Sequence, residues 1–234
     1  MTVPAPRLAA DSVVRRFGAR VVLNAAYVDL MPGLVTALVG VSGSGKTTLL
    51  EILVGRLRPH GGQVRWDGTR VPRPTHAALA RRGMIYAPDR GWLSTRLPVG
   101  RLLELAARVH GTDWRAGARA SGIEALLTRR SPSLSTGEQR LCELALARTC
   151  RPEALVLDEP FRDLEPLHRE AVGRLLVSLA REGTAVLFAD HDARMVLQVA
   201  DRVFAIEDGR TRPVPEFRER PVVEWYRGWA GLQG

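Results

Sequence analysis

The sequence predicts an α/β fold in which a mostly parallel sheet is flanked by helices. Two observations carry this prediction: apolar strand candidates alternate with amphipathic helix candidates, and the strand candidate at 34–39 is an unbroken apolar-rich run typical of a buried parallel strand. A third feature modifies it, because the early residues contain short strands and a strong hairpin signal instead of helices. We therefore expect an N-terminal antiparallel β subdomain next to the main sheet, and, from a later helix-rich stretch, an inserted helical subdomain.

The first half of the chain supplies the antiparallel candidates and the first buried strand. Strand candidates lie at 12–14, 21–23, 27–30 and 34–39. The last is an unbroken apolar-rich run that ends in glycine, which is typical of a buried parallel strand entering a loop. A helix is expected at 47–54, ended by Gly55. The pair Asp67-Gly68 lies between alternating residues and predicts a hairpin over 64–71.

The second half returns to alternating strands and helices after an interruption. A strand candidate at 84–87 is followed by helix-like sequence from about 91 to 150, which we interpret as an inserted helical subdomain. Further strand candidates lie at 154–157, 185–189 and 203–206. We expect one domain over 1–212 with this insertion, and a C-terminal tail over 213–234. The tail aromatics are expected to pack back on the body: Trp225, Tyr226 and Trp229.

Composition indicates an ordinary globular protein, with 45% hydrophobic and 25% charged residues among 234. No apolar run reaches the roughly 20 residues that cross a bilayer, and residues 1–10 do not resemble a signal peptide, so a cytosolic chain is expected. The net charge of +9 allows nucleic-acid or anionic-membrane binding, but scattered arginine pairs favour a solvated surface, and no nucleic-acid partner is expected. Cys142 and Cys150 are expected to be idle reduced thiols.

The stretch Gly40 to Thr48, read GVSGSGKTT, contains Lys46, the one lysine of the chain. It fits the phosphate-loop pattern and lies between an apolar strand and a helix, the context that the pattern requires. Glycines let backbone N–H groups surround phosphates, and a compact ammonium reaches the β- and γ-phosphates better than a planar guanidinium. A glycine-rich turn before a helix is the alternative. The predicted nucleotide-binding residues are Gly40, Ser42, Gly43, Ser44, Gly45, Lys46, Thr47 and Thr48, with the Thr47 hydroxyl on Mg²⁺.

A second motif follows the apolar run Ala154 to Leu157, where a strand ends in Asp158 and Glu159. Asp158 suits a contact to Mg²⁺, and Glu159 suits polarising an attacking water. Because acidic residues also favour the first turn of a helix, the same triplet with Pro160 can simply open a helix. Together with the phosphate loop, the motif predicts the core of a P-loop NTPase with ATP and Mg²⁺ as its cofactors.

A third motif, Leu134-Ser-Thr-Gly-Glu-Gln139, contains a capping box in Ser135 and Glu138 that is sufficient reason for its presence. Lying ahead of a strand that ends in Asp-Glu, it also resembles the signature of the ATP-binding cassette family. The resemblance covers residues 8 to 212. It implies that two ATPase domains meet head to tail and that Ser135 and Gly137 contact a γ-phosphate held by the partner chain.

The resemblance also implies roles for single residues. Phe17 stands where the family places an aromatic ring that stacks on adenine, with turn packing as the alternative. His191 matches the histidine that senses the γ-phosphate, and it joins Glu159 and Lys46 in the predicted catalytic set. Asp89 stands where the family usually has a glutamine that touches Mg²⁺ and the attacking water, so Thr47, Asp89 and Asp158 form the predicted metal set.

Three departures from the family pattern concern turnover. Asp89 replaces the usual glutamine, Thr136 a glycine of the signature, and Glu165 an aspartate of the loop that couples the two ATP sites. An ionised carboxylate accepts hydrogen bonds but cannot donate them. The segment after Tyr86, Pro88-Asp-Arg-Gly91, is similar to the Pro-Glu-Gly-Arg of ATPases from branched-chain amino acid importers.

The predicted function is an ATP-hydrolysing transporter subunit on the cytoplasmic face of the membrane. Its expected partners are a second ATPase subunit, identical or not, and separate transmembrane subunits. ATP binding would close the dimer and hydrolysis would reopen it. Two alternatives stay open: a soluble ATPase of the same fold serving iron–sulfur assembly or repair, and a nucleotide-binding module with little turnover. The sequence does not predict the cargo or the direction of transport.

Overall fold

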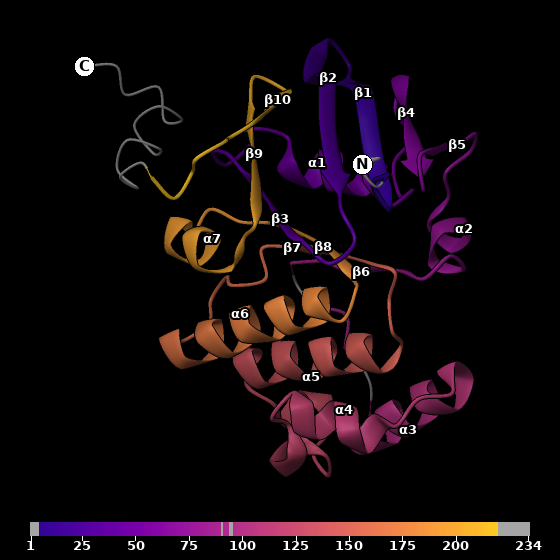
Figure 1. The fold of residues 1–234 in the computed structure, drawn as a ribbon, viewed down its shortest axis with the longest axis vertical. Coiled ribbons are helices and arrows are strands. Elements are labelled where there is room, and N and C mark those ends of the chain that lie inside the picture. Colours follow the sequence, from indigo (N-terminus) through magenta and orange to yellow (C-terminus); the bar gives the residue numbers. More distant parts are fainter. Residues whose placement is uncertain (1–4, 90, 94–95, 220–234) are drawn as a thin grey trace.

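The computed structural model describes residues 5–89, 91–93 and 96–219. Its described elements form two sheets and a set of helices, which follow one another along the long axis of the molecule (Figure 1). A four-stranded sheet lies at one end, a six-stranded sheet follows, and α3 (Val99–His110) and α4 (Trp114–Ala120) lie at the opposite end. The predicted combination of an antiparallel subdomain, a main sheet and a helical part is confirmed.

The smaller sheet is antiparallel, with strand order β2-β1-β4-β5. Its strands are β1 (Leu8–Phe17), β2 (Arg20–Leu30), β4 (Gly61–Trp66) and β5 (Thr69–Val71). The short strands expected at 12–14, 21–23 and 27–30 were wrong in extent, because they belong to one long hairpin. Register shifts along β1 interrupt its alternation of buried and exposed residues, which hides the continuity of the strand.

The hairpin predicted at Asp67-Gly68 is confirmed between β4 and β5. Both residues have positive φ, 49° for Asp67 and 72° for Gly68. Two consecutive residues of this kind are what a type I′ turn requires, and the turn's twist matches that of the flanking strands.

The larger sheet has the order β10-β9-β3-β8-β7-β6 and is parallel except for β10. Its strands are β3 (Val35–Val39), β6 (Met84–Ala87), β7 (Ala154–Asp158), β8 (Ala185–Ala189), β9 (Arg202–Glu207) and β10 (Arg210–Pro213). Every residue of β3, β7 and β8 is buried. Central strands buried on both faces need apolar side chains throughout, which explains their unbroken apolar runs.

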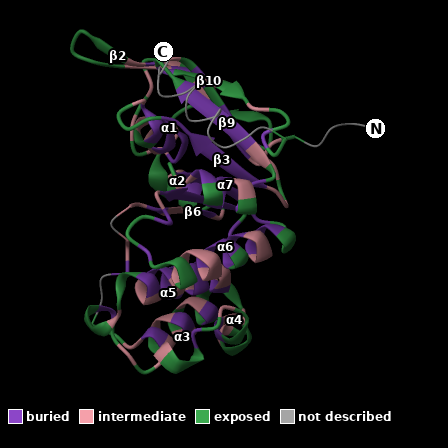
Figure 2. Ribbon diagram, turned by 90° about the vertical axis from the view of Figure 1, so that its left-hand side faces the viewer, coloured by how far each residue is buried: buried purple, intermediate pink, exposed green. Residues whose placement is uncertain are grey.

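Helices cover both faces of the larger sheet. Along β8, Leu187 packs with α1 (Lys46–Leu53) and the smaller sheet, whereas Val186 and Phe188 pack against α6 (Pro166–Arg181) and α7 (Ala193–Val199). The short helix α2 (His76–Ala80), between β5 and β6, was not predicted. Figure 2 shows the buried residues concentrated in the sheets and on the inward faces of the helices.

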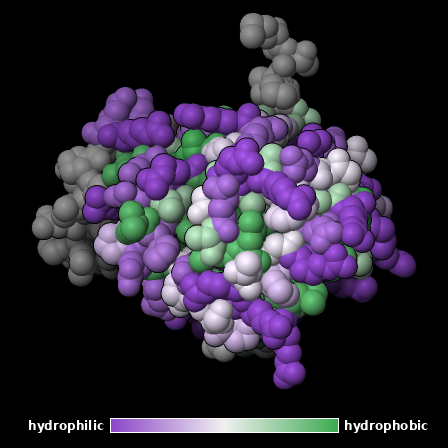
Figure 3. Space-filling view, turned by 90° about the horizontal axis from the view of Figure 1, so that it is seen from below, coloured by the Kyte–Doolittle hydropathy of each residue, from purple (hydrophilic) through white to green (hydrophobic). Residues whose placement is uncertain are grey.

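The predicted helical stretch contains α3, α4, the 3₁₀ turns Glu124–Leu126 and Ser131–Ser133, and α5 (Thr136–Thr149). A separate apolar cluster of Val99, Leu103, Ala118, Ile123 and Ala145 joins α3 and α4 to α5. On its other side α5 packs against α6, so it links the helical part to the main sheet. Seen from the helical end, the surface is mostly hydrophilic with smaller apolar areas between polar side chains (Figure 3).

The main sheet reaches slightly beyond the expected boundary at residue 212, since β10 ends at Pro213. Phe217 of the following segment is buried against the α6 and α7 side of the sheet. The tail aromatics Trp225, Tyr226 and Trp229 lie outside the described residues.

Candidate active site

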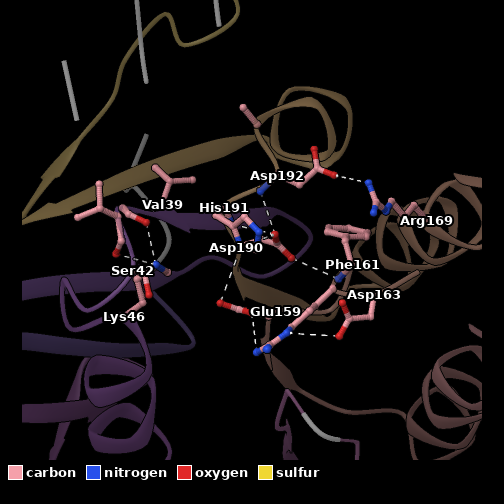
Figure 4. A pocket seen from close by; sticks show the side chains of 14 residues that line it. Val39, Ser42, Lys46, Glu159, Phe161, Asp163, Arg169, Asp190, His191 and Asp192 are labelled. Carbon is pink, nitrogen blue, oxygen red and sulfur yellow. Dashed lines mark hydrogen bonds and ion pairs between the residues drawn. The ribbon is translucent and has the colours of Figure 1, made fainter. Parts of the chain in front are cut away.

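The candidate site lies at the carboxyl edge of the main sheet, where β3, β7 and β8 end. Ligands of open parallel sheets bind at this edge, because the connecting loops and helix N-termini meet there. A cavity of about 880 Å³ opens here, and it brings Lys46, Glu159 and His191 together (Figure 4). Its other lining residues include Gly40, Val41, Ser42, Phe161, Arg162 and Asp190.

The phosphate loop joins β3 to α1 and needs glycine at defined positions. A Cβ atom on Gly40 would lie 2.6 Å from the carbonyl oxygen of Ile206 and 2.8 Å from Ser44 Oγ. Gly45, which precedes the first turn of α1, has φ 107°, a conformation that side chains with a Cβ rarely adopt. The loop therefore depends on glycine for close packing at Gly40 and for chain direction at Gly45.

Lys46 is held over this loop. Its Nζ donates to the carbonyl oxygens of Gly40 at 2.7 Å and Val41 at 3.1 Å, and only 7% of the residue is exposed. Burial lowers the pKa of Lys46, and the carboxylates of Glu159 and Asp158 oppose that shift. The ammonium is thus placed beside the loop amides, where it can exchange carbonyl partners for phosphate oxygens.

Asp158 ends β7 and is 4% exposed. Among the described residues its Oδ1 atom has no hydrogen-bond partner, which is unusual for a buried carboxylate oxygen. Burial raises the pKa of Asp158, while the neighbouring Thr47 hydroxyl and the Lys46 ammonium lower it in part. An orphaned carboxylate oxygen next to a hydroxyl fits a divalent cation, so Asp158 and Thr47 suit Mg²⁺.

Asp89, the third predicted metal residue, lies two residues after the end of β6 and lines a smaller cavity with Thr136 and Arg140. Its carboxylate Oδ2 is 3.5 Å from Arg162 Nη1. In the described part of the chain, no three His, Cys, Asp or Glu side chains cluster closely enough to hold a metal alone. A Mg²⁺ ion here would need oxygen ligands from Thr47, water and phosphate as well, which is its usual habit.

Glu159 follows Asp158 at the mouth of the cavity. Its φ of 45° turns the chain sharply, and its N–H donates to the carbonyl of Ala189 at 2.8 Å. Its Oε1 atom lies 3.8 Å from His191 Nδ1. Positive φ in a residue other than glycine is a strained conformation that clusters at functional sites. Glu159 and His191 thus face the same space as Lys46 (Figure 4), and their catalytic roles stay a prediction.

Asp190 is a site residue that the sequence analysis missed. It is 1% exposed, and its carboxylate accepts hydrogen bonds from the backbone N–H groups of His191 at 2.7 Å, Asp192 at 2.9 Å and Phe161 at 3.2 Å. Burial raises the pKa of Asp190, and these hydrogen bonds partly oppose the increase. Asp190 fixes the turn that presents His191. The available signal was an aspartate directly after a buried strand.

Ser135 and Gly137 lie at the start of α5, outside both cavities that hold Lys46 and Asp89. The predicted capping box is present: Ser135 Oγ accepts from the Glu138 N–H at 3.2 Å, and Glu138 Oε2 accepts from the Ser135 N–H at 2.8 Å. Gly137 is buried under His168, whose ring would be 2.3 Å from an added Cβ. One chain therefore does not bring the signature residues to its own phosphate loop.

A buried ion pair fastens α5 to the segment that carries Asp89. Glu143 accepts from the N–H groups of Trp92 at 2.7 Å and Leu93 at 3.0 Å, and from Arg140 Nη1 at 3.0 Å. Arg140 also donates to the carbonyl oxygen of Asp89 at 3.0 Å. Both side chains are at most 7% exposed. Because both charges are buried and hydrogen-bonded, removing either side chain would leave the other charge buried without its partner.

Phe17 is not among the residues that line the cavity of Lys46. It ends β1 with 49% exposure, and the Arg15 guanidinium lies 4.7 Å from its ring centre. Its predicted stacking on adenine stays a prediction.

The two cysteines are free thiols. Cys142 is buried and Cys150 is partly buried, and burial raises the pKa of Cys142 to about 12. Such thiols are unreactive at neutral pH, which agrees with the expected idle role.

Comparison with known proteins identifies the family. A family model described as ABC transporter matches residues 23–162. The chain belongs to the ABC transporter family. It is 34% identical to the zinc import ATP-binding protein ZnuC of Halorhodospira halophila over 88% of this chain and 75% of that protein. It is also 34% identical to the aliphatic sulfonates import ATP-binding protein SsuB 1 of Pseudomonas syringae pv. tomato, over 90% and 73%.

The fold of this ABC ATPase is also seen in solved structures. A nucleotide-free ATP-binding cassette from an ABC transporter superposes with a TM-score of 0.79 over 94% of this chain and 98% of that chain, at 21% identity. Family membership confirms the predicted activity: the chain is the ATP-binding, ATP-hydrolysing subunit of an ABC transporter. Across the described residues, no helix combines the length and apolar character needed to span a bilayer.

Proposed function

We propose that this subunit works as a head-to-tail dimer in which each ATP is bound between the phosphate loop of one chain and the α5 signature of the other. The observation that carries the proposal is the separation within one chain. Lys46 and Glu159 share a cavity, whereas Ser135 is exposed at another place with its own capping bonds already satisfied. A second copy is the simplest source of a signature for each phosphate loop.

Within this proposal each residue of the cavity has a stated task. Lys46 and the loop amides bind the phosphates, and Thr47 and Asp158 hold Mg²⁺, which when bound neutralises phosphate charge. Asp89 completes the surroundings of the metal. Glu159 accepts a proton from the attacking water, and His191 positions the γ-phosphate; the buried Asp190 orients the turn that carries His191.

The proposed partners are separate membrane-spanning subunits, with this chain on the cytoplasmic face of the membrane. Support comes from the relatives, which are named as ATP-binding proteins of zinc and sulfonate import. Closure of the dimer on ATP and its reopening after hydrolysis would drive the membrane subunits. The likeness of the segment after Tyr86 to branched-chain amino acid importer ATPases stays a prediction, and no cargo is proposed.

A mixing experiment tests the shared site. Lys46→Ala gives a chain with a defective phosphate loop and an intact signature. Ser135→Arg gives a chain with an intact phosphate loop and a defective signature. In a Glu159→Gln background, which blocks hydrolysis, neither variant alone should retain ATP through gel filtration. Their mixture should retain one ATP per two chains, because one composite site is intact.

The contradicting result is equally direct. A mixture that retains no more ATP than its two components would show that the signature of one chain does not serve the other. The matched control is a mixture of the Lys46→Ala chain with a chain that carries Thr69→Arg in place of Ser135→Arg. Thr69 is exposed in β5, away from both regions, so this second chain keeps an intact phosphate loop and an intact signature. That mixture should also retain ATP, and it calibrates the expected signal.

A further inference from the structure

Arg162 stands between the two cavities described above. It is the second residue after Pro160, in the loop that leads from β7 to α6, and it lines both the cavity of Lys46 and the smaller cavity of Asp89. Its Nη1 atom is 3.3 Å from Glu159 Oε2 and 3.5 Å from Asp89 Oδ2. The Arg162 guanidinium therefore lies between the Asp89 carboxylate, which replaces the usual glutamine, and the Glu159 carboxylate, which is assigned to water activation.

The need for such a bridge follows from the local charge. Asp89, Asp158 and Glu159 place three carboxylates at one edge of the sheet, and the Arg162 Nη1 atom lies within 3.5 Å of two of them. Glutamine at position 89 would remove one of these charges and contribute an N–H donor. Aspartate adds the charge and has no donor when ionised, whereas arginine carries five donors in a planar fork.

The geometry indicates a shared contact and not a fixed one. Both ion-pair distances exceed the 2.7 to 2.9 Å of a tight charge-assisted hydrogen bond, and the Arg162 side chain is 51% exposed. Exposed ion pairs add little to folding stability. The loop itself is held by backbone bonds, since the Arg162 N–H donates to the Glu159 carbonyl at 3.2 Å. The side chain is therefore not required for the turn.

We infer that Arg162 is a positioning residue for ATP hydrolysis, which neutralises Asp89 and holds the Glu159 carboxylate toward the reacting phosphate. Asp89 and Arg162 form one functional unit that replaces a single neutral glutamine. The inference rests on the proposed role of Glu159. It predicts that the two positions are coupled: the effect of changing Asp89 depends on whether residue 162 is arginine.

Four variants in the full-length chain test this coupling through kcat and KM for ATP. Arg162→Ala should lower kcat about tenfold with little change in KM, because misplacing a reacting group affects the chemical step. Arg162→Lys, which keeps the charge, should stay within about threefold of the wild type. Asp89→Gln should lower kcat in the wild-type background, yet raise it in the Arg162→Ala background, where it removes a negative charge that the guanidinium no longer faces.

Binding and stability provide readouts that do not depend on turnover. Calorimetry with a non-hydrolysable ATP analogue and Mg²⁺ should give Arg162→Ala an affinity within about twofold of the wild type, since the side chain is assigned no phosphate contact. Its midpoint of thermal unfolding should be unchanged. The control is Arg174→Ala, at an exposed arginine (69%, against 51% for Arg162) that pairs with Glu170 on α6; it should leave kcat unchanged.

Three results would overturn the inference: full kcat in Arg162→Ala, the same factor for Asp89→Gln in both backgrounds, or a lowered unfolding midpoint in Arg162→Ala that shows a structural role. Failure of the proposed function is distinguishable from these. It would appear as undiminished hydrolysis in Glu159→Gln, whatever the behaviour of Arg162.

Discussion

The phosphate-loop edge of the main sheet and the start of α5 differ in how far their polar groups are buried and hydrogen-bonded. At the sheet edge, Lys46, Asp158 and Asp190 are nearly buried charges, and one oxygen of Asp158 lacks a partner among the described residues. At the start of α5, Ser135 is exposed and its hydrogen bonds are satisfied by its own helix. The first region has buried charges that a ligand could pair, whereas the second is satisfied by itself and, in the proposed dimer, gains a function only beside another chain.

The largest expected effect tests the first region. Lys46→Ala should weaken ATP binding by about a hundredfold or more, because it removes a charged donor from a partly dehydrated site. Calorimetric titration with Mg²⁺ and ATP measures the change. If the variant kept its affinity for ATP, Lys46 would not bind the phosphates, and the two regions would not differ in the way described above.

The second region is tested by Ser135→Asn. Asparagine caps helices as well as serine does, so the free energy of unfolding should change by less than about 0.5 kcal/mol. The ATPase rate should nevertheless fall about tenfold, because the hydroxyl that would reach the partner's phosphate is replaced. Denaturant unfolding and a phosphate-release assay separate the two roles. Normal turnover in this variant would mean that Ser135 serves only its own helix.

The loss of folding stability caused by the buried carboxylate at the sheet edge can be measured with Asp158→Asn. Without nucleotide, this change should stabilise the protein by about 1 kcal/mol, since a buried and incompletely paired charge disappears. Because the folded pKa of Asp158 is raised above its ordinary value, the destabilisation by the wild-type carboxyl is complete only above that folded pKa and disappears below the ordinary value. The gain should therefore shrink as the pH falls through the raised pKa. A gain that is independent of pH would refute this explanation, and a loss of stability would show that Asp158 is well paired.

The smallest effect is expected at Glu138, again at the start of α5. Glu138→Gln keeps an oxygen for the Ser135 N–H but loses the ion pair with Arg129, which measures 2.7 Å and is partly exposed. Unfolding free energy should fall by less than about 0.5 kcal/mol. Chemical denaturation of the two proteins in parallel measures it. A drop of several times this size would show that the helix start depends on charge and is not self-sufficient.

The same contrast explains what the sequence could predict. The phosphate loop and the pair Asp158 and Glu159 could be proposed from the sequence because each is a short motif at the end of one buried strand. The capping box of Ser135 was also local. The bridge from Arg162 to Asp89 was not predicted, since it joins residues far apart in the chain through an approach that only the sheet order creates. Strand extents along β1 failed for a related reason, because bulges break the alternation.

The buried pair of Arg140 and Glu143 has a mechanical consequence. The loop after β6 and the signature helix cannot slide past one another without stripping partners from a desolvated charge. We therefore expect the backbone at Asp89, Trp92 and Leu93 to move together with α5. A displacement of α5 should therefore also displace the backbone that carries Asp89.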